Sequence, residues 1–236
     1  MSISFKTNEI LLWGDLHGLD RAIYILNSTL NIDNQTILML GDFGLGFSSR
    51  ENDDARLKKI NILCRQRNIL LYVISGNHDN KDFWRRGYEF SNLFLIKDYT
   101  PAIFPNKKTA LLVGGGISID RSSRREGLDY WSDEITIYVK QNEHYDYLFA
   151  HDCPNYFNNS TESLWSSPYQ DFLRDDPDLF EDALDQRNVI GQIVEDIKCE
   201  WCFSGHFHNN VKEEKNGIKY QCLNIEELFI FDSNIF

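Results

Sequence analysis

The stretch Ile10-Leu11-Leu12-Trp13-Gly14-Asp15-Leu16-His17-Gly18 sets a pattern that recurs along the chain. Its first four residues form a short apolar run, which is typical of a strand buried on both faces. A polar string with a glycine, an aspartate and a histidine follows, and residues 19–30 then carry apolar side chains at helical spacing. The stretch therefore predicts a strand, a polar loop at its carboxyl end and a helix.

Seven further apolar runs resemble the first one. The predicted strands are residues 10–13, 37–40, 69–74, 93–96, 110–113, 147–149, 201–203 and 228–231. Helical spacing marks residues 19–30, 53–67 and 180–197. The alternation of strands and helices in the first half predicts parallel pairing with helices packed outside. The consecutive strand signals of the second half predict a mixed sheet there.

Five polar strings follow five of these runs, and together they hold five of the six histidines. Ligands of open α/β sheets gather at the carboxyl ends of strands, so these strings can converge on one crevice. Their mixture of carboxylate, imidazole and amide donors suits Mn²⁺, Fe²⁺ or Zn²⁺ better than Ca²⁺. The strings are Gly14-Asp15-Leu16-His17-Gly18, Gly41-Asp42-Phe43-Gly44, Gly76-Asn77-His78-Asp79, Ala150-His151-Asp152 and Gly205-His206-Phe207-His208.

The spacing inside the strings suggests how they work. In Asp15-x-His17 and His206-x-His208, residues two apart on an extended backbone point the same way, so both side chains can reach one site. The glycines that flank these strings allow tight turns and a close approach of the backbone to a ligand. His144 lies in no such string, and we expect it at the surface.

Taken in order, the five strings resemble the motifs of the calcineurin-like metallophosphoesterase superfamily, from Asp15 to His208. The resemblance implies a four-layer α/β/β/α sandwich with two mixed β-sheets and a dinuclear metal site at the carboxyl ends of the strands. It implies two divalent ions, Mn²⁺ first, with Fe²⁺ or Fe³⁺, Zn²⁺ and Ni²⁺ as alternatives. The implied ligands are Asp15, His17 and His208 for one metal, Asn77, His151 and His206 for the other, and Asp42 as the bridge.

The resemblance also implies a reaction. A hydroxide held between the two metals attacks the phosphorus of a phosphomonoester or phosphodiester. His78 contacts the phosphate or protonates the leaving oxygen, and Asp79 and Asp152 are candidates to orient an imidazole. The alternative is a catalytically silent binding scaffold, but such proteins typically lose ligands or the histidine of the third string, and none is missing here.

Two departures bear on the substrate. Ser/Thr protein phosphatases of the superfamily usually continue the second motif into Asp-Arg-Gly and end the third with Glu. Here Gly41-Asp42-Phe43-Gly44-Leu45-Gly46 lacks that arginine, and the third string ends with Asp79. We therefore expect a small phosphorylated or nucleotide-like substrate. A nuclease, a cyclic-nucleotide diesterase and a protein phosphatase remain alternatives.

A glycine-rich segment, Gly114-Gly115-Gly116, leads into three arginines. Because a guanidinium presents a planar fork to phosphate oxygens, we expect Arg121, Arg124 or Arg125 to grip the substrate phosphate. The alternative is a solvated turn in which these arginines pair with Glu126 and Asp129.

Several aromatic residues have two interpretations. Trp84, Tyr130 and Trp131 either stack on a base or pack in the core. Residues 154–177, which include Trp165, form either a functional excursion near the active site or a passive insertion. We interpret residues 1–236 as a single domain that contains this excursion.

The bulk composition limits the partners. A net charge of −12 argues against a broad basic face for duplex nucleic acid, although a metal site could still attract a nucleotide. The polar N-terminus and the absence of a membrane-length apolar run predict a cytoplasmic protein without a membrane partner. Five cysteines predict reduced thiols, and we interpret Cys199 and Cys202 as buried apolar residues. The oligomeric state stays open.

Overall fold

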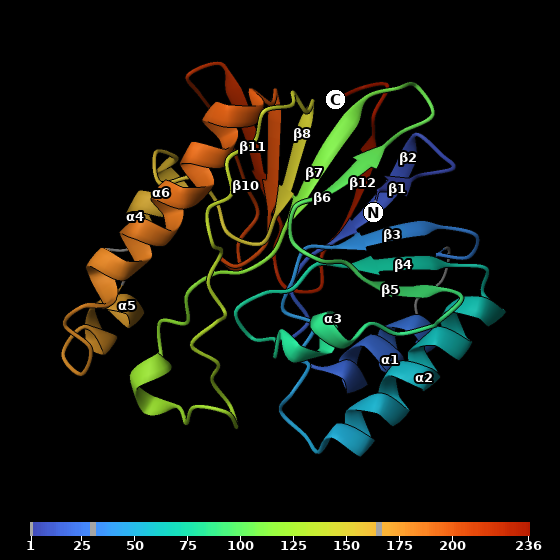
Figure 1. The fold of residues 1–236 in the computed structure, drawn as a ribbon, viewed down its shortest axis with the longest axis horizontal. Helices are drawn as coiled ribbons and strands as arrows, with labels where there is room; N and C mark the ends of the chain where they lie inside the picture. The colour runs from blue at the N-terminus through green and yellow to red at the C-terminus, as the bar shows by residue number, and fades with distance from the viewer. Residues whose placement is uncertain (1, 29–31, 164–166) are drawn as a thin grey trace.

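The computed structural model describes residues 2–28, 32–163 and 167–236. Two β-sheets lie against each other, and helices cover the outer face of each (Figure 1). The strands are β1 (Ile3–Ser4), β2 (Glu9–Trp13), β3 (Thr36–Met39), β4 (Leu70–Val73), β5 (Leu93–Leu95), β6 (Thr100–Ile103), β7 (Thr109–Val113), β8 (Tyr147–Ala150), β9 (Trp201–Ser204), β10 (Val211–Lys215), β11 (Ile218–Cys222) and β12 (Leu228–Asp232). The helices are α1 (Leu19–Ser28), α2 (Arg50–Gln66), α3 (Asp82–Arg86), η1 (Arg121–Ser123), α4 (Asn158–Ser163), α5 (Ser167–Phe172) and α6 (Leu179–Ile197).

The smaller sheet has the order β12-β2-β3-β4-β5. Its strands β2 to β5 are parallel, with Trp13 beside Met39 and Met39 beside Val73. Parallel neighbours need crossovers, which α1 and α2 provide between β2, β3 and β4. The carboxyl ends of these three strands therefore lie side by side. The last strand, β12, adds to the edge in the antiparallel sense, so this sheet is mixed rather than wholly parallel.

The larger sheet has the order β1-β6-β7-β8-β9-β11-β10. Its central strands β7, β8 and β9 are parallel, whereas β6 pairs with β7, and β10 with β11, in the antiparallel sense. The mixed sheet predicted for the second half is thus confirmed. Like β2 to β4, the parallel strands β8 and β9 deliver their carboxyl ends to one region.

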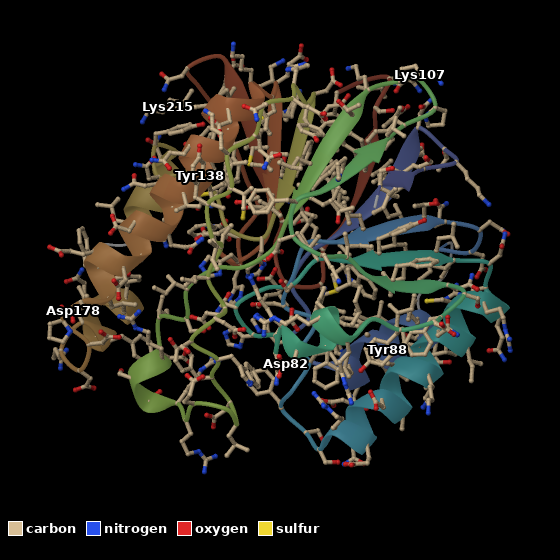
Figure 2. The ribbon with its side chains drawn as sticks, in the orientation of Figure 1. Asp82, Tyr88, Lys107, Tyr138, Asp178 and Lys215 are labelled. Carbon is tan, nitrogen blue, oxygen red and sulfur yellow. The ribbon has the colours of Figure 1, made fainter. Side chains whose placement is uncertain are left out.

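Three apolar cores join the layers. The faces of α1 and α2 pack on the smaller sheet, and Ile190, Val194 and Ile197 of α6 pack on the larger one. Side chains from both sheets fill the space between them (Figure 2), where Phe231 packs on Tyr147 and Phe149. These contacts confirm the four-layer α/β/β/α sandwich with two mixed sheets.

The differences from the predicted elements have local causes. Four strands were not predicted: β1 spans two residues, β6 contains Pro101, β10 is largely charged and exposed, and β11 mixes polar residues with its apolar ones. Helix α2 begins three residues before its apolar pattern, because the Ser49 side chain caps it by accepting from the backbone of Asn52. Helix α1 ends at Ser28, and the remainder of its predicted span lies outside the described residues.

The cysteines behave as predicted. All five are free and buried, and burial raises the pKa of Cys199 to about 12. Such a thiol stays protonated and unreactive near neutral pH. Within the described part of the chain, no helix has both the length and the apolar character that a membrane crossing requires.

Candidate metal centre

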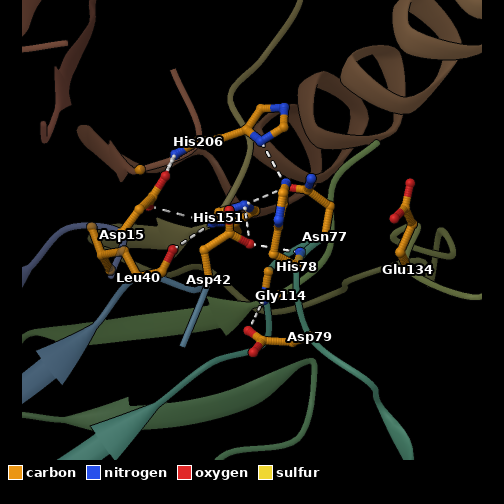
Figure 3. A network of polar contacts seen from close by, with 12 residues as sticks. Asp15, Leu40, Asp42, Asn77, His78, Asp79, Gly114, Glu134, His151 and His206 are labelled. Carbon is orange, nitrogen blue, oxygen red and sulfur yellow. Dashed lines mark hydrogen bonds and ion pairs between the residues drawn. The ribbon is translucent and has the colours of Figure 1, made fainter. Parts of the chain in front are cut away.

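The seven predicted ligands come together at the carboxyl ends of five strands. Asp15 and His17 follow β2, Asp42 follows β3 and Asn77 follows β4 of the smaller sheet. His151 follows β8, and His206 and His208 follow β9, in the larger sheet. Figure 3 shows most of these side chains converging between the two sheets.

One half of the centre, called here the open half, consists of Asp15, His17 and His208. The Nε2 atoms of His17 and His208 are 2.8 Å apart, and His208 Nε2 lies 3.3 Å from Asp15 Oδ2. Asp42 joins this group through its Oδ2, which lies 3.6 Å from His17 Nδ1. One donor atom from each of these four residues falls within 4.8 Å of the others.

The other half, called here the buried half, consists of Asn77, His151 and His206. Asn77 Oδ1 lies 2.8 Å from His151 Nε2 and 2.9 Å from His206 Nδ1. His151 Nε2 is also 3.3 Å from Asp42 Oδ1. Asp42 thus turns one carboxylate oxygen to each half. Two groups of nitrogen and oxygen donors that share a carboxylate fit two divalent cations.

Four of the seven residues have a left-handed backbone. The φ angles are 53° at His17, 51° at Asp42, 70° at His206 and 53° at His208. Left-handed backbone is uncommon for residues other than glycine, and it concentrates at functional sites. The expectation of an extended backbone in Asp15-x-His17 and His206-x-His208 was therefore wrong. The turns send His206 and His208 to different halves of the centre.

Two glycines show how closely the strings pack. A Cβ atom on Gly76 would lie 2.0 Å from Asp42 Oδ1, and one on Gly205 would lie 2.1 Å from Asp15 Oδ1. Any side chain there would displace a candidate ligand. An added Cβ on Gly18, by contrast, meets no atom within 4 Å, so that glycine is not required for close approach.

The residues that support the ligands differ from those expected. His151 Nδ1 faces the carbonyl oxygen of Leu40 at 2.7 Å, rather than Asp152. Asp152 instead accepts from the backbone of Cys153. Asp79 holds no imidazole either, because it accepts from the backbone N–H groups of Phe43, Gly44, Leu45 and Gly76. It therefore ties the second string to the third.

The electrostatics of the centre suit metal binding. Burial alone would raise the pKa of Asp42, but His151, His78 and His17 together lower it below its ordinary value. Burial, aided by the charge of His151, holds the pKa of His206 well below its ordinary value. An ionised carboxylate and a neutral imidazole both present free lone pairs to a cation.

A cavity of about 290 Å³ opens over the centre. His78 stands on its wall, and its backbone N–H donates to Asp42 Oδ1 at 2.8 Å. Burial lowers the pKa of His78 to about 4, so this imidazole is neutral at pH 7. The other residues lining the cavity are Asp42, Asn77, Ile117, Ile119, Ser163, Tyr169, Arg187, His206, Phe207 and His208.

The three predicted arginines lie in different surroundings. Arg124 Nη2 is 3.0 Å from His78 Nε2 and donates to Asp120. Arg121 pairs with Asp176 and Asp182. Arg125 is 73% exposed and pairs with Asp129, the ion pair that our alternative interpretation expected. The substrate role of all three stays a prediction, and Arg124 is the one that contacts His78.

Other residues near the cavity gave no usable signal in the sequence. Phe47 is 45% exposed and its ring stacks beside His78. Arg187 is buried, lies over the Phe207 ring and donates to the Ser160 carbonyl. A lone phenylalanine in a loop and an arginine on an amphipathic helix both look ordinary in a sequence.

Two of the three aromatic residues pack in the core, and the excursion contributes to the cavity wall. Trp84 is buried and its indole donates to the carbonyl of Val73, and Trp131 is also buried, so both pack in the core. Within residues 154–177, α4 and α5 form, and Ser163 and Tyr169 reach the cavity wall. Trp165 lies outside the described residues.

Comparison with known proteins agrees with the geometry. The family model for calcineurin-like phosphoesterases matches residues 9–210, and the chain belongs to this family. Membership supports a metal-dependent phosphoesterase in general terms, and the cluster of aspartates and histidines points to divalent metal binding. Curated protein sequences give no match. A similar solved structure is described as "GAP50 the anchor in the inner membrane complex of Plasmodium"; it is 12% identical, with 95% of this chain and 78% of that chain covered and a TM-score of 0.43.

Proposed function

We propose that the protein is a dinuclear metal-dependent hydrolase of compact phosphoesters. The observation that carries this proposal is the division of the donors into two groups that share Asp42. When bound, two divalent cations supply Lewis acidity and lower the pKa of water held between them. We propose Mn²⁺ as the ion, since imidazole, carboxylate and amide oxygen together suit it.

The chain's own residues supply the rest of the chemistry. Asp15, His17 and His208 would hold one cation, Asn77, His151 and His206 would hold the other, and Asp42 would offer one carboxylate oxygen to each. His78 lies next to the centre on the cavity wall, so its imidazole can contact the phosphoryl group or the leaving oxygen. Arg124, which lies against His78, adds a guanidinium for the phosphoryl oxygens.

The cavity supports a compact substrate. Its volume of about 290 Å³ suits a small molecule, and Ile117, Ile119 and Phe207 give it an apolar wall for the group that carries the phosphate. Phe47 offers an exposed ring beside His78 for a base or an aromatic leaving group. We propose a phosphorylated small molecule or nucleotide as the substrate, and the cytoplasm as the location.

The test is turnover of chromogenic phosphate esters by metal-loaded protein. We expect hydrolysis of p-nitrophenyl phosphate or bis(p-nitrophenyl) phosphate that a chelator abolishes and Mn²⁺ restores. The ratio of the two rates separates a monoesterase from a diesterase. Protein that binds two Mn²⁺ ions per chain yet hydrolyses neither ester would contradict the proposal.

The role of His78 has its own test. We expect His78→Ala to lower kcat by about 100-fold, because a positioned proton donor or acceptor contributes about that much or more. Its Mn²⁺ content should equal that of the wild type, and loss of metal would refute the assigned role. His144→Ala is the matched control, because that imidazole lies outside the cavity and is largely exposed.

A further inference from the structure

A chain of buried hydrogen bonds leads away from the buried half of the centre. Asn77 Nδ2 donates to Ser118 Oγ at 3.0 Å. Ser118 in turn donates twice to Glu134, from its backbone N–H to Oε1 at 2.6 Å and from its hydroxyl to Oε2 at 2.7 Å. None of the three residues exposes more than 3% of its surface. In Figure 3, Glu134 lies on the side of Asn77 that faces away from His151.

The direction of these bonds determines which end of the Asn77 amide faces the centre. In the metal-loaded protein, cations bound at the centre would favour the ionised form of Glu134, and a carboxylate has only acceptor oxygens, so both donors of Ser118 are then used on Glu134. Ser118 Oγ then has only lone pairs left and must accept from Asn77. The Asn77 NH₂ group is thereby held away from the centre, and Oδ1 faces His151 and His206. A flipped amide would present hydrogens to a cation instead of a lone pair.

The glycine-rich segment after β7 places Ser118 at this position. Gly116 lies so close to the ligands that an added Cβ would be 3.2 Å from the ring of His151. Two bonds tie the segment to the loop that carries Glu134: Gly116 N–H donates to the Glu134 carbonyl at 3.2 Å, and Thr136 Oγ1 donates to the Gly114 carbonyl at 2.7 Å. Ser118 and Glu134 are therefore held together as one unit against the centre.

We propose that Glu134 and Ser118 are positioning residues that fix the Asn77 amide with its oxygen toward the buried half of the metal centre. This inference rests on the proposed function, since it assigns Asn77 to a cation. The hydrogen-bonded chain from Glu134 through Ser118 to Asn77 is called the relay below. Because it supports only Asn77, disturbing the relay weakens one of the two metal sites and leaves the other intact. Residues that orient metal ligands typically change metal affinity by about 10- to 100-fold when replaced.

The test measures Mn²⁺ binding by equilibrium dialysis of the full chain, with the bound metal quantified. The main variant is Glu134→Gln, which keeps the side-chain shape. Its NH₂ group donates to Ser118 Oγ and frees the hydroxyl hydrogen, so Asn77 is no longer held in one orientation. We expect one of two Mn²⁺ sites to weaken about 10- to 100-fold. Ser118→Ala, which removes the acceptor, should have the same effect.

Two further variants separate positioning from general damage. In Asn77→Asp, either carboxylate oxygen serves the cation, so adding Ser118→Ala should change the Mn²⁺ affinity less than about threefold. Ser233→Ala is the matched control: this serine is also buried and bonded, to Asn8, but lies at the opposite end of the sheet. It should bind both ions as the wild type does.

The outcomes are distinct. Suppose that the wild type binds two Mn²⁺ ions and that the relay variants bind both ions as tightly as the wild type does. This result would overturn the relay and leave the proposed function standing. Equal weakening of both sites, or an undiminished effect of Ser118→Ala in the Asn77→Asp background, would also overturn it by showing general damage. Wild type that binds fewer than two ions and hydrolyses no ester would overturn the relay and the proposed function together.

Discussion

The open and buried halves of the centre use similar donors but differ in how the protein holds them. The His17 and His208 side chains are 25% and 44% exposed, whereas His151 is completely buried. In the buried half, His151 and Asn77 each contact a supporting group that is not a ligand, namely Leu40 O and Ser118. In the open half, the imidazoles contact each other and the carboxylates of Asp15 and Asp42.

This difference indicates that the two halves have different roles in binding metal. The buried half is preorganised by the fold, so binding a cation there requires little rearrangement. The open half is accessible to water and ligands, so its cation should exchange more readily. Left-handed residues occur in both halves, so backbone strain does not distinguish the open half from the buried half. The two halves differ in the exposure of their imidazoles and in their supporting hydrogen bonds.

The largest effect should come from the one residue that belongs to both halves. Asp42→Asn removes a negative charge that each cation shares, and the loss of several kcal/mol of charge stabilisation corresponds to about 1,000-fold in kcat. We expect both metal affinities to fall together, as measured by dialysis and by ester turnover. If only one site weakened, Asp42 would belong to that half alone.

A second comparison replaces one histidine of each half. His151→Ala removes a completely buried imidazole and should lower the free energy of unfolding by about 2–4 kcal/mol, as large-to-small core substitutions do. His208→Ala removes a half-exposed one and should change it by less than about 0.5 kcal/mol. Urea unfolding in the presence of chelator measures both without metal. Equal losses of stability would show that the two halves are held alike.

Much of this arrangement could be predicted from the sequence. The five strings stand directly after apolar runs, and parallel strands put their carboxyl ends at one edge, so the meeting of Asp15, Asp42 and Asn77 follows from topology. The order of the strings then identified the family, and with it the four-layer fold. These features are local in the chain and highly patterned, which is why they could be read without a structure.

The supporting contacts could not be predicted, because they link isolated residues in loops. Ser118 and Glu134 belong to no periodic pattern, and their partner Asn77 is 41 residues from Ser118 in sequence. The partner of His151 is the backbone carbonyl of Leu40, and a backbone contact of this kind cannot be predicted from the residue type. His17 and His208 have a left-handed backbone, which residues other than glycine adopt uncommonly, so a rule based on extended strands failed there.

A smaller effect concerns the entry to the centre. Arg124→Ala removes a guanidinium beside His78, and losing one charged hydrogen bond of about 1.5 kcal/mol should raise KM for a phosphate ester about tenfold. Arg125→Ala is the matched control, because this neighbour is exposed and paired with Asp129. Its KM should change by less than about twofold. An equal KM for the two variants would place phosphate recognition elsewhere.

The last effect is a pH dependence of the stability of the metal-free, chelator-treated protein, and it comes from Glu134 beside the buried half. Burial raises the pKa of Glu134 from 4.5 to about 8, although hydrogen bonds from Ser118 oppose the shift. The folded state thus binds this proton more tightly than the unfolded state does, so the associated stability is complete below pH 4.5 and is lost as the pH rises through 8.

Glu134→Gln has no such proton to lose, and all other titrating groups are common to both proteins. The difference in unfolding free energy, wild type minus variant, should therefore decline between pH 6 and pH 8 and level off by pH 9 when urea unfolding is measured at pH 6, 7, 8 and 9. A difference that stayed constant, or rose, would mean that Glu134 is already ionised in the folded protein at pH 6. In that case the buried half would carry a permanent negative charge next to Asn77, and the contrast with the open half would rest on exposure alone.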